Sequence, residues 1–600
     1  MNILPPNTRT LGCALATLML AACGTSPMRT DTPPSTPATA APDSSRHAAF
    51  GPIRESVHRD GDDLVSAGLG LEGLRNASAP AFADPAAPTV AELRRRAIWS
   101  NWRGIADLRP GGGAGDELPV VAGREFATLA RLEGANEPHR VVLQLPDAFD
   151  LEQRCVVVAV ASGSRGPYGA IAVAAPWALP RGCALVHTDK GAGSDYFDLA
   201  TGLGPDANGQ IVAPGITPVF APAQQAEGGI AFKHAHSRDN PEADWGRHVH
   251  QAAQFALRVL DDQYPAQAPF TAANTRVIAV GISNGGGAVL RAAEIEDGLI
   301  DAVVAGEPNI HVDAPGSRAL FDYGSLAARL MPCALLALDD LPQPPLTAQL
   351  RSLGEQRCAS LRARGELAGA DVAAQARDAL QQLHAAGFDD AALRGGTSSV
   401  GFDLWRAVLA TYASAYGRFG PGEHPCGFRW ALVDADGQPR ATTAQEQATW
   451  WSEGSGIPPG NGIALLDPQR GETDPDLAGI DCLRALWEGN SEAAERVRAG
   501  VAQTRAGLPR EGLPVVIVHG QDDGLIPMAF SSVPYAAMAQ AAGREVVFWP
   551  VPAAQHFDAF LALPDYGARY VPLLPKVHAA LDAVWTRLQD PAAHLPDAAP

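Results

Sequence analysis

The sequence lacks three features that would point to common binding proteins. It has no excess of basic residues, since 46 Lys and Arg stand against 66 Asp and Glu, a formal net charge of −20. This argues against binding to nucleic acid or an anionic membrane surface. Apolar runs long enough to cross a bilayer are missing, and so is a Cys-x-x-Cys pair, so we expect neither a transmembrane segment nor a zinc ribbon. What is present is a chain of 600 residues, 46% of them hydrophobic, which exceeds one ordinary domain and can bury a large core.

The first residues resemble an export signal. Residues 11–22 form an apolar run that is too short to span a bilayer, and Cys23 follows two alanines, as in a bacterial lipoprotein signal. We therefore expect a signal peptide over 1–22 and a disordered tether over 23–50, because residues 25–45 are rich in Pro, Ser, Thr and Ala. Two outcomes stay open: a lipid anchor on Cys23 that makes the protein an outer-membrane lipoprotein, or ordinary cleavage and release as an extracellular protein.

Six cysteines follow Cys23, and cysteines in an exported chain commonly form disulfides. Pairing between sequence neighbours keeps each bond within one region. We therefore predict Cys155–Cys183, Cys333–Cys358 and Cys426–Cys482. Buried free thiols are the alternative.

Buried strands alternate with helices in the first half of the chain. Apolar, β-branched runs at 141–146, 155–161, 183–189 and 302–308 predict strands, and a helix over 249–260 precedes a further strand near 277. Such alternation predicts a doubly wound, mostly parallel sheet of the α/β class.

The alternation stops near residue 311 and returns with strands at 514–518 and 544–550. Between them the chain is Ala-rich and predicted to be mainly helical, for example over 361–386. Its tryptophans line a substrate cleft or form its own core, and the second interpretation is favoured. The predicted organisation is the first part of an α/β core over 51–310, an inserted cap over 311–508, the second part of the core over 509–590 and a tail over 591–600.

A nucleophile motif lies where the strand near 277 meets the next helix. Residues 281–285 read Gly-x-Ser-x-Gly, with Ser283 at the centre. The order of buried strand, Gly-x-Ser-x-Gly and helix is the nucleophile elbow of α/β-hydrolases, in which glycines leave room for the neighbouring strand and helix. An incidental serine in a Gly-rich turn is the alternative.

Partners for the serine follow later strands in the order that this fold requires, acid before histidine. After strand 514–518, the pattern His-Gly-x-x-Asp-x-x-x-Pro places Asp523 in the acid position, with Asp522 as a rival. After strand 544–550, His556 lies in the loop where a general base belongs. We expect His556 to take the proton of Ser283 during attack on an ester, while Asp523 orients the imidazole and an acyl-enzyme forms.

The oxyanion of such a reaction needs two preorganised donors. We expect one to be the backbone N–H of Asn284. The second is predicted at Ser164, in the Gly-rich loop 162–166. Arg165 is a candidate to bind a substrate carboxylate, unless it is an ordinary solvated arginine.

Two histidine pairs, His234 with His236 and His248 with His250, invite a metal interpretation. They follow no known ligand spacing, and a Ser-His-Asp hydrolase needs no metal. We therefore expect no metal and no cofactor, and a polar loop on the rim of the site.

Several of these stretches together resemble the D-(−)-3-hydroxybutyrate oligomer hydrolases. The matching stretches are 161–166, 232–237 with its His-Ala-His-Ser sequence, 244–247 with Asp-Trp-Gly-Arg, and 277–294 around Ser283. The resemblance covers about residues 60–588. It implies a serine esterase that cleaves soluble (R)-3-hydroxybutyrate oligomers to monomers, downstream of a polyhydroxybutyrate depolymerase. The residues by themselves indicate only hydrolysis of a small soluble ester.

Two other functions stay open. A tannase-like or feruloyl-esterase-like carboxylesterase also carries a large cap, but the chain has no Asp-x-Asp-x-Asp run typical of its calcium loop. A non-catalytic binding protein of the cell envelope could be built on the same scaffold, although it would be expected to lose a member of the triad.

Overall fold

The computed structural model describes residues 50–223, 228–343, 347–457 and 462–599. The predicted signal peptide and Cys23 lie outside the described residues. Within the described ranges, no helix combines the length and the apolar character that a membrane crossing requires.

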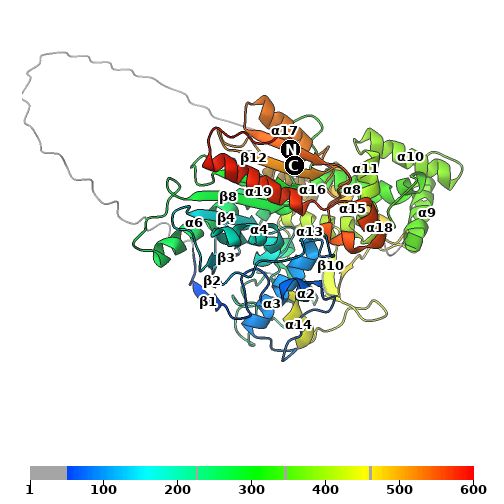
Figure 1. Ribbon diagram of the computed structural model, residues 1–600. Coiled ribbons are helices and arrows are strands. Elements are labelled where there is room, and N and C mark those ends of the chain that lie inside the picture. Colours follow the sequence, from blue (N-terminus) through cyan, green and yellow to red (C-terminus); the bar gives the residue numbers. More distant parts are fainter. Residues whose placement is uncertain (1–49, 224–227, 344–346, 458–461, 600) are drawn as a thin grey trace, which may run out of the picture. The chain divides into compact units, whose positions relative to one another are not determined.

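A nine-stranded sheet is the central element of the described chain (Figure 1). Its strands lie side by side in the order β1 (Arg54–His58), β2 (Gly123–Ala130), β3 (His139–Pro146), β5 (Ala184–Thr188), β4 (Cys155–Val160), β8 (Arg276–Ile282), β9 (Ala302–Gly306), β12 (Val515–Gly520) and β13 (Val546–Val551). All neighbours from β5 to β13 are parallel, and those from β1 to β5 are antiparallel. The mostly parallel sheet confirms the predicted α/β-hydrolase class.

Helices cover both faces of this sheet, because successive side chains of a buried strand point to opposite sides. On β8, Ile278 and Val280 join one core cluster and Val277 and Ala279 join the other. The first cluster includes side chains of α3 (Val90–Ile105), α4 (Ile171–Ala178) and α19 (Leu574–Gln589). The second includes side chains of α6 (Trp245–Gln263), α7 (Asn284–Ala292) and α17 (Ser532–Ala541).

The antiparallel edge strands β1 and β2 were not predicted from the sequence. β1 reads Arg-Glu-Ser-Val-His and has three exposed residues in succession, so it lacks the apolar signal of the central strands. Three short helices lie outside the segment between β9 and β12: α2 (Gly70–Arg75), α5 (Lys233–His236) and α18 (Pro564–Arg569).

Between β9 and β12 the chain is mainly helical. Its helices are α8 (Leu320–Ala334), α9 (Thr347–Ala363), α10 (Val372–Ala385), α11 (Asp390–Gly395), α12 (Thr397–Gly401), α13 (Leu404–Gly417), α14 (Ala444–Trp450), α15 (Leu477–Glu488) and α16 (Glu492–Gln503). Two short strands, β10 (Arg429–Leu432) and β11 (Ile463–Leu466), pair antiparallel. The domain limits near 310 and 508 stay a prediction.

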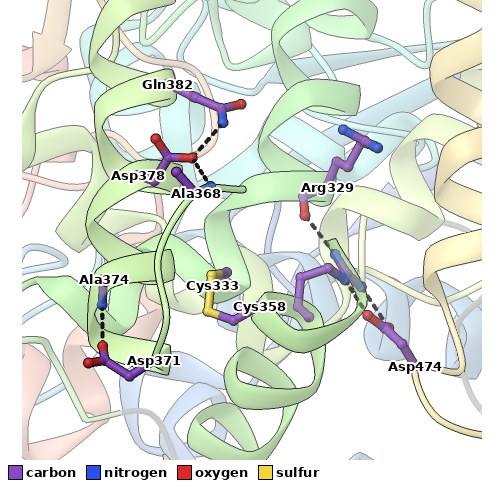
Figure 2. The surroundings of a disulfide bond; sticks show 10 residues. Arg329, Cys333, Cys358, Ala368, Asp371, Ala374, Asp378, Gln382 and Asp474 are labelled. Carbon is purple, nitrogen blue, oxygen red and sulfur yellow. Dashed lines mark hydrogen bonds and ion pairs between the residues drawn. A yellow bond between two sulfur atoms is a disulfide. The ribbon is translucent and has the colours of Figure 1, made fainter. Parts of the chain in front are cut away.

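The stretch 361–386 is not one continuous helix as expected, because α9 ends and α10 begins within it. Gly365 and Gly369 between them have φ angles of 76° and 110°, which side chains rarely allow and a helix excludes. Asp371 then starts α10 by accepting a hydrogen bond from the Ala374 N–H at 2.8 Å (Figure 2).

All three predicted disulfides are confirmed. They join residues 28, 25 and 56 positions apart, with Cα–Cα distances of 4.6, 5.0 and 5.8 Å. Cys333–Cys358 ties α8 to α9 (Figure 2). Closing loops of this length stabilises a chain by roughly 3 to 4 kcal/mol per bond.

The tryptophans of the inserted region mostly form its own core. Trp405, Trp430 and Trp450 belong to a buried cluster built largely from the helices between β9 and β12, and Trp487 packs against it. Trp451 instead joins the cluster on one face of the sheet.

Candidate active site

Ser283 occupies a strained turn between β8 and α7. Its φ and ψ angles are 55° and −122°, a combination that only a tightly constrained backbone maintains. A Cβ atom on Gly281 would lie 2.4 Å from the Gly285 carbonyl carbon, and one on Gly285 would lie 2.3 Å from the Val160 oxygen. The two glycines are therefore required by the close approach of neighbouring backbone, as the motif predicts.

The structure brings Ser283, His556 and Asp523 together. The Ser283 Oγ lies 3.1 Å from His556 Nε2, and His556 Nδ1 lies 2.7 Å from Asp523 Oδ2. Because an ionised carboxylate only accepts hydrogen bonds, His556 Nδ1–H donates to Asp523, and Nε2 is left to accept from the serine hydroxyl. The loops after β12 and β13 carry the acid and the histidine to the end of β8.

Asp523 is held as a carboxylate by its surroundings. Burial raises its pKa, but the charge of His556 and hydrogen bonds from His519 and His556 outweigh burial and keep the pKa below its usual range. Its Oδ1 accepts the Leu525 and Ile526 N–H groups at 2.9 and 2.7 Å. The rival Asp522 makes no such contact with His556, and burial raises its pKa.

Of the two predicted oxyanion donors, Asn284 is the first residue of α7, where helix geometry leaves the N–H without an intrahelical acceptor. Its side chain is fixed by Asn309, whose Nδ2 donates to Asn284 Oδ1 at 3.0 Å. The Ser164 N–H, in contrast, donates to the Gly456 carbonyl at 2.7 Å. For Ser164 to serve an oxyanion, that hydrogen bond must break.

Arg165 is not a solvated surface residue, because its side chain is buried. Its Nε donates to the Gly454 carbonyl at 2.9 Å, and an Nη donates to the Gly104 carbonyl at 3.0 Å. Burial lowers its pKa to about 10. The guanidinium borders a cavity shared with Ser283 and His556, and it holds the segment 454–456 beside the nucleophile.

The expectation that the histidine-rich segment is a polar loop on the rim is wrong, because α5 and its side chains are buried. His234 Nδ1 lies 2.6 Å from Ser164 Oγ, and its Nε2 lies 2.6 Å from Glu242 Oε1. His236 Nδ1 accepts the Phe232 N–H. Within the described ranges, no group of three or more His, Cys, Asp or Glu residues is arranged to hold a metal ion.

Sequence reasoning missed two residues beside the nucleophile. Glu307 follows β9 and borders a cavity together with Ser283 and His556. Burial, with Asp558 and Asp523 nearby, raises its pKa well above the usual range. Tyr412 of α13 contacts the Asn284 side chain. Glu307 could have been found from the sequence, because it stands at the end of a parallel strand next to β8. Tyr412 belongs to α13, outside the sheet, and no sequence pattern pointed to it.

Two small cavities, of about 40 and 50 Å³, border Ser283, and Gly456 and Ile457 line both of them. A cavity of about 340 Å³ lies elsewhere, lined by β1, β2, β3, α3 and Trp451. Volume alone would favour the larger cavity as the active site, but the strained Ser283 and its partner His556 border the smaller ones. We therefore place the candidate active site at Ser283.

Comparison with known proteins finds one family over most of the chain. The sequence model of the family described as 3HB-oligomer hydrolase matches residues 36–599. A D-(−)-3-hydroxybutyrate oligomer hydrolase of Paraburkholderia xenovorans (strain LB400) is 36% identical, over 88% of this chain and 83% of that protein. One of the same description from Burkholderia pseudomallei (strain 668) is 36% identical, over 90% of this chain and 87% of that protein.

Solved structures with partial likeness include a tannin acyl hydrolase from Aspergillus niger and feruloyl esterase B from Aspergillus oryzae. The first is 11% identical with a TM-score of 0.34, covering 86% of this chain and 82% of its own. The second is 14% identical with a TM-score of 0.30, covering 76% and 77%.

Proposed function

The chain belongs to the 3HB-oligomer hydrolase family, and on that premise we propose that it hydrolyses soluble (R)-3-hydroxybutyrate oligomers to 3-hydroxybutyrate. The observation that carries the chemistry is the hydrogen-bonded series Ser283–His556–Asp523 at the end of a parallel sheet. Such a series suits ester hydrolysis through a serine nucleophile, and its complete state supports an enzyme rather than a binding protein.

In the proposed reaction, the Ser283 hydroxyl attacks the carbonyl carbon of an ester. His556 Nε2 takes the serine proton, and Asp523 stabilises the imidazolium that results. His556 then gives that proton to the departing alcohol oxygen as the carbon–oxygen bond breaks. His556 then deprotonates a water molecule, which attacks the acyl carbon. The bond to Ser283 Oγ breaks, Oγ takes the proton back from His556, and the hydroxy acid leaves.

The oxyanion is proposed to bind at the N-terminus of α7, on the Asn284 N–H. Such a donor contributes roughly 10²- to 10³-fold in rate. The Ser164 N–H joins it when the Gly456 carbonyl moves away. The proposal that Arg165 binds a substrate carboxylate requires the guanidinium to exchange its bonds to Gly454 and Gly104 for the ligand.

We propose that the protein is exported, either freely or with a lipid on Cys23. Three disulfides in the described chain support this, because such bonds form and persist mainly outside the reducing cytosol.

The test is a substrate panel. Purified protein is incubated with 3-hydroxybutyrate dimer, trimer, polymer film and methyl gallate, and products are separated by chromatography. We expect monomer from the dimer and trimer, and none from the Ser283→Ala variant, whose fold circular dichroism verifies. Cleavage of the gallate alone would contradict the proposed substrate.

A further inference from the structure

A second series of serine, histidine and carboxylate ends at the cavity that contains Ser283. Ser164 Oγ, His234 and Glu242 are joined by two contacts of 2.6 Å each. The three side chains belong to separate segments: the loop after β4, helix α5, and the 3₁₀ turn Pro241–Asp244. Ser164 is 7% exposed, His234 0% and Glu242 1%. We name Ser164, His234 and Glu242 the second relay.

The hydrogen bonds of the second relay determine whether Ser164 Oγ donates or accepts toward a ligand. The Glu242 carboxylate accepts hydrogen bonds and donates none, so His234 Nε2 carries the proton of that bond. In a neutral imidazole the other nitrogen is then an acceptor. With the imidazole neutral, the Ser164 hydroxyl donates to His234 Nδ1. Its oxygen has lone pairs left and no hydrogen, which makes it an acceptor toward the cavity.

The cavity around this acceptor is mainly apolar. Ser164 and Ser283 both line it, and the aliphatic side chains of its wall are Leu320, Val408, Ile457, Leu525 and Ile526. Tyr412, also in the wall, packs edge-on against His234 with ring centroids 5.0 Å apart and so restricts the imidazole. A ligand that fits has a short aliphatic chain with one hydroxyl that donates to Ser164 Oγ.

We propose that the second relay recognises the free hydroxyl of a hydroxyacyl group that is bound to Ser283. This rests on the proposed function and adds a direction of attack to it. In an oligomer of 3-hydroxybutyrate, only the terminal unit at the hydroxyl end has an O–H on its third carbon, since the same oxygen is esterified in every interior unit. Recognition by an acceptor therefore selects the hydroxyl-terminal unit as the acyl group, and the chain is shortened by one unit from that end.

A matched pair of esters tests this recognition. Ethyl (R)-3-hydroxybutyrate and ethyl butyrate share the alcohol and the chain length and differ in one hydroxyl. We measure kcat/KM for both by titrating the released acid. The wild type should prefer the hydroxy ester by roughly 10- to 100-fold, the effect of a buried polar group that is paired or left unpaired.

Substitution Ser164→Ala should reduce that preference by the same factor, whatever happens to the rate on each ester. Ser398→Ala is the control, a buried serine of α12 that donates to the Gly395 carbonyl; it should keep the wild-type preference. A Ser164→Ala enzyme that retains the preference would overturn the proposal. Ser164→Thr, which keeps the hydroxyl, should retain most of the preference; a complete loss there would also count against it.

The wild type alone supplies an independent test. A 3-hydroxybutyrate trimer with a free terminal hydroxyl is compared with its O-acetyl derivative. The free trimer should be cleaved at least about 10-fold faster and should first lose its hydroxyl-terminal unit. Equal rates would refute the second relay and leave the proposed function intact. If neither trimer is cleaved, both the proposed function and the inference fail.

Discussion

Ser283 and Ser164 border the same cavity, and each hydrogen-bonds to a histidine that is backed by a carboxylate. Their backbones differ. Ser283 is held in a strained turn at the start of a nine-residue helix, where the next N–H group has no intrahelical acceptor. Ser164 lies in a loop, and its own N–H is bound by Gly456.

A serine–histidine–carboxylate series does not by itself define a nucleophile. Attack on a carbonyl also requires donors placed where the oxyanion develops. Only Ser283 has such a donor next to it in sequence, at the N-terminus of α7. The same three kinds of side chain around Ser164 leave an oriented acceptor, which suits recognition of a hydroxyl group.

The largest difference in the loss of kcat is expected between substitutions of the two carboxylates. Asp523→Asn should lower kcat on ethyl butyrate by roughly 10⁴-fold, because the imidazole of His556 loses the partner that fixes its tautomer. Glu242→Gln should lower kcat on the same ester by less than about 100-fold, since Glu242 contacts no reacting atom. Equal losses would erase the distinction between the two series.

A buried titratable group lies near each of the two series. Asp558, two residues after His556, accepts the Leu573 and Leu574 N–H groups, and burial raises its pKa to about 7. Lys190 donates to the Gly163 carbonyl beside Ser164, and burial lowers its pKa to about 7. The two groups therefore change protonation in opposite directions relative to the unfolded chain.

These pKa values predict opposite slopes in stability. Between about pH 4 and 7 the folded state keeps a proton on Asp558 that the unfolded chain has lost, so its contribution to stability falls as pH rises. Between about pH 7 and 10 the folded state lacks a proton that the unfolded chain holds on Lys190, so stability rises with pH. Each effect is on the order of 4 kcal/mol.

Urea unfolding across this pH range measures both slopes. Asp558→Asn should flatten the acidic slope only, and Lys190→Gln the alkaline slope only. If each variant merely shifts the whole profile without changing either slope, the assigned protonation states are wrong.

The features that could be predicted from the sequence depend on residues that lie close together in the chain. The glycines around Ser283 and the acid and histidine after buried strands are recognisable within a few residues, and disulfides between sequence neighbours follow from short separations. The edge strand β1 has polar, exposed residues and gives no such pattern. The second relay joins three segments, so its histidine was interpreted as part of a surface loop. Only tertiary contacts place His234 between Ser164 and Glu242.

The most direct test of the different roles of the two serines is covalent labelling. A fluorophosphonate phosphonylates an activated serine whose oxyanion site is formed, with loss of fluoride, and peptide mass spectrometry identifies the modified residue. We predict one equivalent of label on Ser283, with activity lost in proportion, and none on Ser164. Label on Ser164, or full activity with Ser283 modified, would contradict this account.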